Sequence, residues 1–227
     1  MTPEKQHPGG NRGGNSERSD QESTPNQFVV HATPRQDLRT RLVANALPYL
    51  STLLGCTEDE AWTAPVTFQI FDDTPRKDQG RAKVLHGCLD DLGDHLEELN
   101  AQGDGIFITI NQTDLKGRKK TNIAALRAAW ADIDDKIASE PFDLNNLPLA
   151  PTMVVRSGHG VHLYWCFPEA IPCDETRRAE HEAMLRGIQT VLAPFGADPK
   201  VCFVQTVLRL PGYYNMKLEP VLVVVYP

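Results

Sequence analysis

The sequence predicts an α+β domain with a mixed, largely antiparallel sheet. Two observations carry this prediction. Stretches with helical periodicity alternate along the chain with short runs rich in β-branched and aromatic residues. Two of these runs are separated only by the glycine-rich turn around Gly158, which is the pattern of a β-hairpin.

The expected elements follow in chain order. Helices are expected over residues 35–54, with a kink at Pro48, over 79–100 and over 175–192. Strands are expected over 66–71, 105–110 and 128–134, followed by the hairpin. Residues 121–126 are interpreted as a helix or a loop, and a final segment begins at Thr206. The helix over 175–192 has the clearest pattern, because an apolar stripe runs between its polar positions.

Length and composition indicate one folded domain behind a polar start. The chain has 227 residues, enough for a substantial core. Residues 1–27 are rich in Gly and Pro and poor in apolar residues, so they are expected to be a disordered tail, with one domain over 28–227. No stretch resembles a signal peptide or a membrane span, and the five scattered cysteines include no C-x-x-C pair. These features favour a reducing cytoplasm and argue against a structural zinc.

Two aspartates one residue apart, Asp132 and Asp134, end an apolar run. On a strand, side chains at i and i+2 point to the same face, so both carboxylates would converge while Ile133 turns into a core. Like charges held that close require a cation or a shared proton, and an oxygen-only pair suits Mg²⁺ or Mn²⁺. The alternative is that the pair simply ends a strand and begins a solvated turn.

The hairpin and a later segment add further candidates. Arg156 and Ser157 end the first hairpin strand, and His162 lies early in the second, where it could face the aspartate pair. A lone strand histidine is more often structural, but one that follows a D-x-D strand with Arg and Ser nearby favours a functional role. After the last helix come a third carboxylate, Asp198, and three donors suited to a triphosphate, which are Arg209, Asn215 and Lys217.

In this order, the segments resemble the three motifs of the archaeo-eukaryotic primase superfamily. The motifs are D-h-D, then S-G-x-G-V-H, then an Asp followed by L-R-L-P-G-x-x-N-x-K. Within that superfamily the chain resembles the catalytic domains of plasmid and phage replication primases of the RepB-primase type. Further stretches similar to that group are residues 66–73, 85–87, 105–114 and 117–118.

The resemblance implies an RRM-like primase–polymerase catalytic sheet packed with a smaller N-terminal α/β unit. It implies that Asp132, Asp134 and Asp198 hold Mg²⁺ or Mn²⁺. The residues implied to be nucleotide-binding are Arg156, Ser157, His162, Arg209, Asn215 and Lys217. The implied activity is metal-dependent, template-directed nucleotidyl transfer, a DNA primase or primase–polymerase making primers on single-stranded DNA. The substrates would be NTPs or dNTPs. The primers would serve the replication of a plasmid, phage or other mobile element, and a replicative helicase would be a further partner.

Two departures from that group stand beside the resemblance. Phe203 and Thr206 occupy positions where an acid and an arginine are expected, and the chain ends shortly after the third motif. A catalytically degenerate domain that binds nucleotide or nucleic acid is therefore an alternative. A rolling-circle initiator or relaxase is another, with Tyr213 or Tyr214 as nucleophile. The spacing of His159 and His162 argues against it, because residues i and i+3 on a strand face opposite sides.

The net charge of −7 is unusual for a protein that binds nucleic acid, but the charge is unevenly placed. One compact basic segment is predicted to touch the template backbone, through Lys116, Arg118, Lys119 and Lys120. The alternative is a merely solvated loop.

Overall fold

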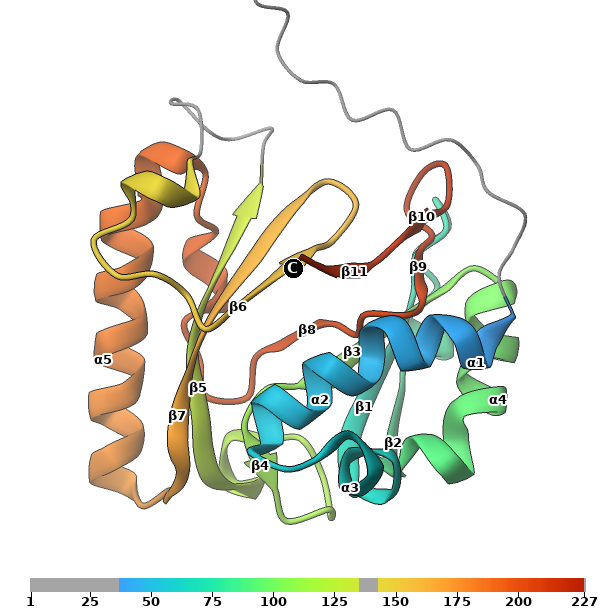
Figure 1. The fold of residues 1–227 in the computed structure, drawn as a ribbon, viewed down its shortest axis with the longest axis horizontal. Helices are drawn as coiled ribbons and strands as arrows, with labels where there is room; N and C mark the ends of the chain where they lie inside the picture. Colours follow the sequence, from blue (N-terminus) through green and yellow to red (C-terminus); the bar gives the residue numbers. More distant parts are fainter. Residues whose placement is uncertain (1–36, 135–142, 227) are drawn as a thin grey trace, which may run out of the picture. The chain divides into compact units, whose positions relative to one another are not determined.

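The computed structural model describes residues 37–134 and 143–226. They build two antiparallel sheets that pack beside each other (Figure 1), one of four strands in the order β2-β1-β3-β8 and one of five in the order β11-β6-β7-β5-β4. The predicted α+β class is confirmed, and every strand pairing among these residues is antiparallel.

The four-stranded sheet is built mainly from the first half of the chain. Its strands are β1 (Val66–Asp72), β2 (Lys83–Gly87), β3 (Asp104–Thr109) and β8 (Val207–Arg209). β8 comes from a segment about a hundred residues after β3, and its pairing brings Arg209 opposite Phe107. The sheet is therefore complete only when β8, which belongs to the third sequence motif, pairs with β3.

The helices of this half lie in two stretches of chain, α1 (Leu38–Arg41), α2 (Leu47–Leu54) and α3 (Glu58–Thr63) before β1, and α4 (Leu89–Ala101) before β3. Between α1 and α2 the helix has a π-helical stretch, Leu42–Ala46, which is continuous with both. Pro48 is the second residue after this stretch, and it has no N–H to donate to the preceding turn, which accounts for the irregularity there. α3 begins with a capping box in which Thr57 and Glu60 bond reciprocally.

The five-stranded sheet carries the first two sequence motifs. Its strands are β4 (Gln112–Thr113), β5 (Ile123–Asp134), β6 (Met153–Arg156), β7 (Gly160–Pro172) and β11 (Val224–Tyr226). A separate short pair joins β9 (Tyr214–Asn215) to β10 (Val221–Leu222). Turns of 3-10 helix lie at Gln79–Arg81, Lys120–Asn122, Leu144–Asn146, Ala193–Phe195 and Pro199–Val201.

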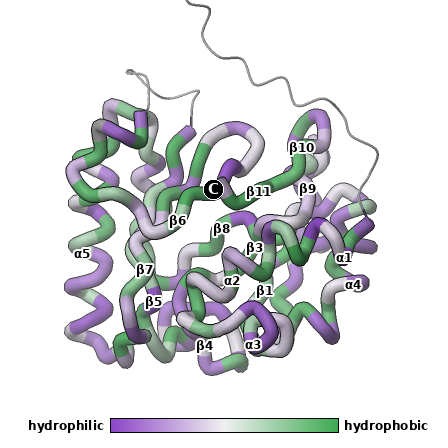
Figure 2. The backbone as a smooth tube through the Cα atoms, viewed as in Figure 1, coloured by the Kyte–Doolittle hydropathy of each residue, from purple (hydrophilic) through white to green (hydrophobic). Residues whose placement is uncertain are grey.

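α5 (Glu175–Leu192) packs along β5 and has the bounds that its apolar stripe predicts. Two buried side chains of α5 bond strand carbonyls, since Gln189 Nε2 donates to Trp130 O at 2.9 Å and His181 Nε2 lies 2.9 Å from Ala128 O. Figure 2 shows hydrophilic and hydrophobic residues mixed along α5 and hydrophobic ones concentrated in the strands.

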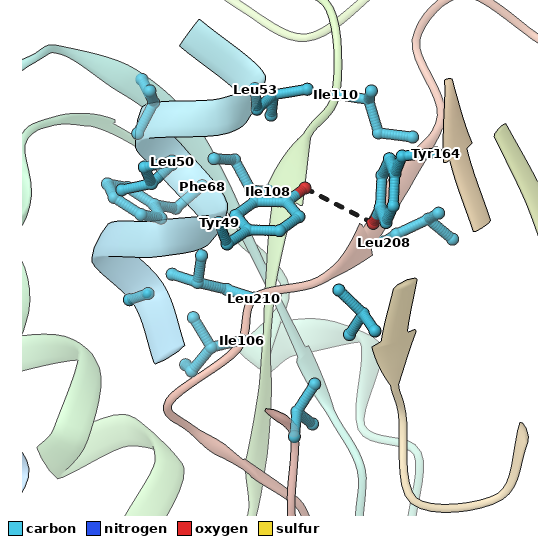
Figure 3. Packing of buried hydrophobic residues seen from close by; sticks show 14 of the residues in the cluster. Tyr49, Leu50, Leu53, Phe68, Ile106, Ile108, Ile110, Tyr164, Leu208 and Leu210 are labelled. Atoms are coloured by element: carbon cyan, nitrogen blue, oxygen red, sulfur yellow. Dashed lines mark hydrogen bonds between the residues drawn. The ribbon is translucent and has the colours of Figure 1, made fainter. Parts of the chain in front are cut away.

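One hydrophobic core joins the two sheets. It contains Ile106 and Ile108 from the four-stranded sheet and Trp130 and Val155 from the other. At its centre Tyr49 of α2 meets Tyr164 of β7 edge to face (Figure 3), with ring centroids 5.5 Å apart and hydroxyls 3.4 Å apart. Both tyrosines are fully buried, so this contact fixes how α2 and the five-stranded sheet meet.

The helix expected over residues 79–100 was wrong in its first half. Residues there form a 3-10 turn and then β2, because Val84 and Leu85 pair with β1 and this tertiary pairing outweighs local helix propensity. Similarly, β5 begins at Ile123, within the stretch interpreted as helix or loop, since it pairs with β4 and β7. The predicted tail, residues 1–27, lies outside the described residues. No helix among the described residues is long and apolar enough to cross a membrane.

Candidate active site

A cavity of about 210 Å³ lies where the ends of the two sheets meet. Its walls come from the three sequence motifs and from β3, so residues about a hundred positions apart face one space. The lining residues are Phe107, Asp132, Ile133, Asp134, Ser157, His159, His162, Asp198, Val201, Val207, Leu208, Arg209, Asn215 and Lys217.

Asp132 and Asp134 reach the cavity from the end of β5. In the pairing with β7, Asp132 stands opposite His162 and Asp134 opposite Gly160. Ile133 between them is fully buried and packs in a separate cluster with Ala131, as alternation on a strand requires. At Gly160 an added Cβ would collide with the carbonyl oxygen of Ile133, so only glycine allows the hairpin to approach β5 this closely.

Asp198 is placed beside the pair by backbone hydrogen bonds. The segment before it runs antiparallel to the end of β5, with a bridge between Ile133 and Ala197. Asp134 N donates to Gly196 O at 2.9 Å, and Asp198 N donates to Asp132 O at 2.8 Å. Three carboxylates from two distant segments thereby meet at one edge.

Burial and the neighbouring acids change the acidity of Asp132. Burial is the largest cause and the charges of Asp198 and Asp134 act in the same direction, while Lys217 and Arg209 act in the opposite one, and together they raise the pKa of the Asp132 carboxyl to about 6. The ionised form of Asp132 is thus held in an unfavourable environment that a cation would relieve.

His162 lies on the floor of the cavity and is only 3% exposed. Its Nε2 is 3.7 Å from Asp132 Oδ1, and its buried Nδ1 has no hydrogen-bond partner among the described residues. Burial, and to a smaller extent the charges of Arg209 and Lys217, lower the pKa of His162 to about 3, so the ring is neutral at neutral pH. A neutral imidazole can donate one hydrogen bond and accept another.

The cations Arg209 and Lys217 face the carboxylates across the cavity. Arg209 ends β8 and makes a bidentate ion pair with the buried Asp73, at 2.6 and 3.1 Å. Lys217 follows β9, and its backbone N donates to the side chain of Asn215 at 3.2 Å. Asn215 also donates from Nδ2 to Ser157 O at 2.7 Å, which ties the third motif to the hairpin.

Two hairpin residues lie where the sequence did not lead us to expect them. Arg156 is not among the cavity-lining residues, since the alternation of β6 turns it to the other face, where its guanidinium packs over the ring of Tyr226 at 4.7 Å. His159, which its spacing from His162 predicts to face the opposite side, lines the cavity as well.

The basic segment lies at the opposite end of β5. It precedes Ile123, and the nine residues from there to Asp132 span roughly 30 Å at about 3.3 Å per residue. Arg118 is tied to Gln69 and to Gln205 O, and Lys120 pairs with Glu182 at 2.8 Å. Lys116 and Lys119 are exposed.

Comparisons with known proteins bear on this arrangement. No protein-family model matches the chain. Over 137 residues it is 26% identical to a replication protein of Clostridium perfringens, a match that covers 56% of this chain and only 33% of that protein.

Solved structures give the fold. The AEP domain of the cyanophage S-2L primase–polymerase matches with a TM-score of 0.56 at 19% identity, over 86% of this chain and 91% of that one. Primase RepB′ matches with a TM-score of 0.52 at 17% identity, over 80% of this chain and 55% of that one. The catalytic domain of primase RepB′ in complex with initiator DNA matches with a TM-score of 0.51 at 18% identity, over 80% of this chain and 82% of that one. The chain has the primase–polymerase catalytic fold.

A primase–polymerase fold implies a divalent cation, and the donor chemistry of the cavity fits one. The carboxylates supply the oxygen ligands that Mg²⁺ and Mn²⁺ prefer, and the repulsion around Asp132 is of the kind a cation relieves. Within residues 37–134 and 143–226, however, no group of three or more His, Cys, Asp or Glu side chains already has the spacing of a metal site.

The rival interpretation as a relaxase requires Tyr213 or Tyr214 as the nucleophile. Tyr213 is 1% exposed and donates its hydroxyl hydrogen bond to Gly93 O at 3.3 Å. The ring of Tyr214 packs under the guanidinium of Arg41, 5.0 Å from its centroid. Neither tyrosine lines the cavity of this primase–polymerase fold.

Sequence reasoning missed two residues that shape the cavity. Phe107 contributes an aromatic wall and packs 4.6 Å beneath the guanidinium of Arg209. Asp73 holds that guanidinium from outside the cavity. The sequence signal that could have indicated Asp73 is the Asp72-Asp73 pair at the end of the apolar strand β1. By contrast Phe203, whose identity departs from the expected acid, is 46% exposed and does not line the cavity.

Proposed function

We propose that this protein is a DNA primase or primase–polymerase, which joins nucleotides on a single-stranded DNA template to make primers for the replication of a plasmid, phage or other mobile element. The fold and the relative named a replication protein support this proposal. The substrates would be NTPs or dNTPs, and a replicative helicase would be a further partner.

One observation carries the proposal. Three carboxylates and two cations from three separate segments face one another across a single cavity, with a neutral histidine between them. No local sequence feature brings these segments together, and phosphoryl transfer requires both charges at one place.

Each side chain then has a role that follows from its position. A bound divalent cation would supply Lewis-acid activation of the attacking hydroxyl and the α-phosphate. Asp132, Asp134 and Asp198 would hold it, Arg209 and Lys217 would bind the β- and γ-phosphates, and His162 would donate a hydrogen bond to a phosphate oxygen. Ser157 and Asn215 would fix the hairpin against the third motif.

The test is primer synthesis by the purified chain. A single-stranded DNA template is incubated with Mn²⁺ or Mg²⁺ and labelled NTPs or dNTPs in separate reactions, and products are resolved by length. Template-dependent products that disappear with EDTA and with Asp132→Asn support the proposal. No product with either metal and either nucleotide type contradicts it.

A second candidate, binding without catalysis, is favoured by two observations. Arg209 is already neutralised by Asp73, and the three carboxylates lack the spacing of a formed metal site among the described residues. A degenerate domain would bind single-stranded DNA or nucleotide in a filter or calorimetric assay while incorporating none. The same wild-type preparation, assayed for both, separates the two functions.

A further inference from the structure

Asp73 lies behind the cation side of the cavity, immediately after β1. It is 3% exposed and does not line the cavity itself. Its two carboxylate oxygens accept from both terminal nitrogens of Arg209, at 2.6 and 3.1 Å. This end-on, bidentate geometry fixes the guanidinium in one plane and one direction.

The same carboxylate also reaches the segment that carries Lys217. Met216 N donates to Asp73 Oδ2 at 3.4 Å. Lys217 is the next residue, and its own N–H is held by Asn215. Asp73 is therefore bonded to both segments that bring cations into the cavity, directly to Arg209 and through the backbone to Lys217.

The surroundings of Asp73 keep its carboxylate in this position. Arg209 is held on a second side by the ring of Phe107, its partner in the β3–β8 pairing. Gly105 leaves the space that the carboxylate occupies, since a Cβ there would collide with Asp73 Oδ2 and lie 2.8 Å from both Asp73 Cγ and a Phe107 ring carbon. Lys77 contributes a weaker contact from the exposed side, at 4.0 Å.

This pairing has a consequence for how Arg209 acts. Its charge is balanced by Asp73, so it adds little net positive potential to the cavity. A guanidinium has five N–H donors, and the carboxylate takes two of them. The remaining donors are held in fixed directions, which suits recognition of phosphate oxygens by geometry more than by net charge.

We propose that Asp73 is a positioning residue, which orients Arg209 and the Lys217 segment toward the phosphates of the incoming nucleotide. The inference rests on the proposed nucleotidyl transfer, and it assigns the residue that sets the geometry of the cation side. Asp73 itself touches neither substrate nor metal.

The experiment is a double-mutant cycle in the primer-synthesis assay, with kcat and KM measured separately for the nucleotide. Asp73→Asn and Arg209→Gln should each lower kcat/KM by roughly 100-fold, mainly through KM, since a misplaced phosphate-binding group costs about that much. The double variant should lose less than about twofold more than Arg209→Gln alone, because Asp73 acts through Arg209. Single-stranded DNA affinity should stay unchanged in all three.

Two further variants separate positioning from stability. Gly105→Ala keeps both charges but displaces the Asp73 carboxylate, and it should raise KM in the same direction. Asp72→Asn makes the same change one residue earlier, at a buried acid that pairs with Arg81 at 3.8 Å. It should lower the melting temperature about as Asp73→Asn does while leaving KM unchanged.

The outcomes are distinct. Multiplicative losses for Asp73→Asn and Arg209→Gln, or a KM for Asp73→Asn equal to that of Asp72→Asn, would overturn the inference while the proposed function stands. An inactive wild-type protein would instead overturn the proposed function, and the inference with it.

Discussion

The two walls of the cavity handle their charges in opposite ways. On the wall formed by β5 and the segment around Asp198, three like charges lie close together, and burial together with their repulsion raises the pKa of Asp132 to about 6. On the wall formed by β8 and the turn after β9, Arg209 is paired with Asp73 and stacked on Phe107. The carboxylate wall therefore stores repulsion that a cation relieves, whereas the cation wall is already held in its working geometry.

The largest expected effect comes from removing a charge from the carboxylate wall. Asp132→Asn should reduce nucleotide incorporation roughly 10³-fold or more, because in the proposed function Asp132 helps to hold the cation whose Lewis-acid stabilisation is worth several kcal/mol. Asp134→Asn and Asp198→Asn should act in the same direction. The rate of steady-state nucleotide incorporation with Mn²⁺ measures each loss. Asp94→Asn, on the exposed face of α4, is the matched control.

The same substitution also tests the repulsion. Because the fold disfavours the ionised form of Asp132, Asp132→Asn should leave the melting temperature at pH 7 without divalent ions unchanged or higher. A clear loss of stability, or full activity, would mean that Asp132 is an ordinary structural carboxylate and that the two walls do not differ as described.

On the cation wall, Lys217→Met sharpens the contrast. Lys217 is exposed and, unlike Arg209, has no carboxylate partner within ion-pair distance among the described residues. Its loss should raise the KM for nucleotide roughly 10- to 100-fold, the worth of a hydrogen bond to a charged group, with a smaller change in kcat. The exposed Lys83→Met is the control, and equal KM values for the two variants would remove Lys217 from the site.

The same contrast explains what the sequence could predict. Asp132 and Asp134 follow from strand alternation, and α5 follows from its apolar stripe, because both depend on residues near in sequence. The pairing of Asp73 with Arg209 could not be predicted, since the two residues lie 136 positions apart and meet only through the β3–β8 pairing. Arg156 shows the limit of motif position alone, because one step along β6 turns it out of the cavity.

The stability of the fold in acid tests whether Asp72 and Asp73, which lie next to each other behind the cation wall, belong to one hydrogen-bond network or to two. Asp72, the neighbour of Asp73, accepts from Thr74 N and Asp78 N at 2.8 Å each. A hydrogen bond from the Thr74 side chain, together with these backbone bonds, holds the pKa of Asp72 at about 2, below its usual value of 3.8. A depressed folded pKa stabilises the fold above about pH 4, and this stabilisation is lost as the pH falls from about 4 through 2.

Asp72→Asn should therefore flatten the dependence of melting temperature on pH between 4 and 2, as followed by circular dichroism. Nucleotide incorporation at neutral pH should be unaffected. If incorporation falls as it does for Asp73→Asn, the two aspartates form one network and Asp73 has no separate role.

The smallest expected effect lies outside the cavity, at the other end of β5. Arg118 and Lys120 are used in contacts within the fold, so only the exposed Lys116 and Lys119 have side chains free to meet a template backbone. Replacing both with Ala should reduce the slope of log affinity for single-stranded DNA against log salt by about 1.4, at 0.7 per phosphate contact. At about 30 Å from Asp132 the double variant should leave kcat unchanged. Fluorescence anisotropy across a salt series measures the slope, and an unchanged slope would identify the segment as a solvated loop.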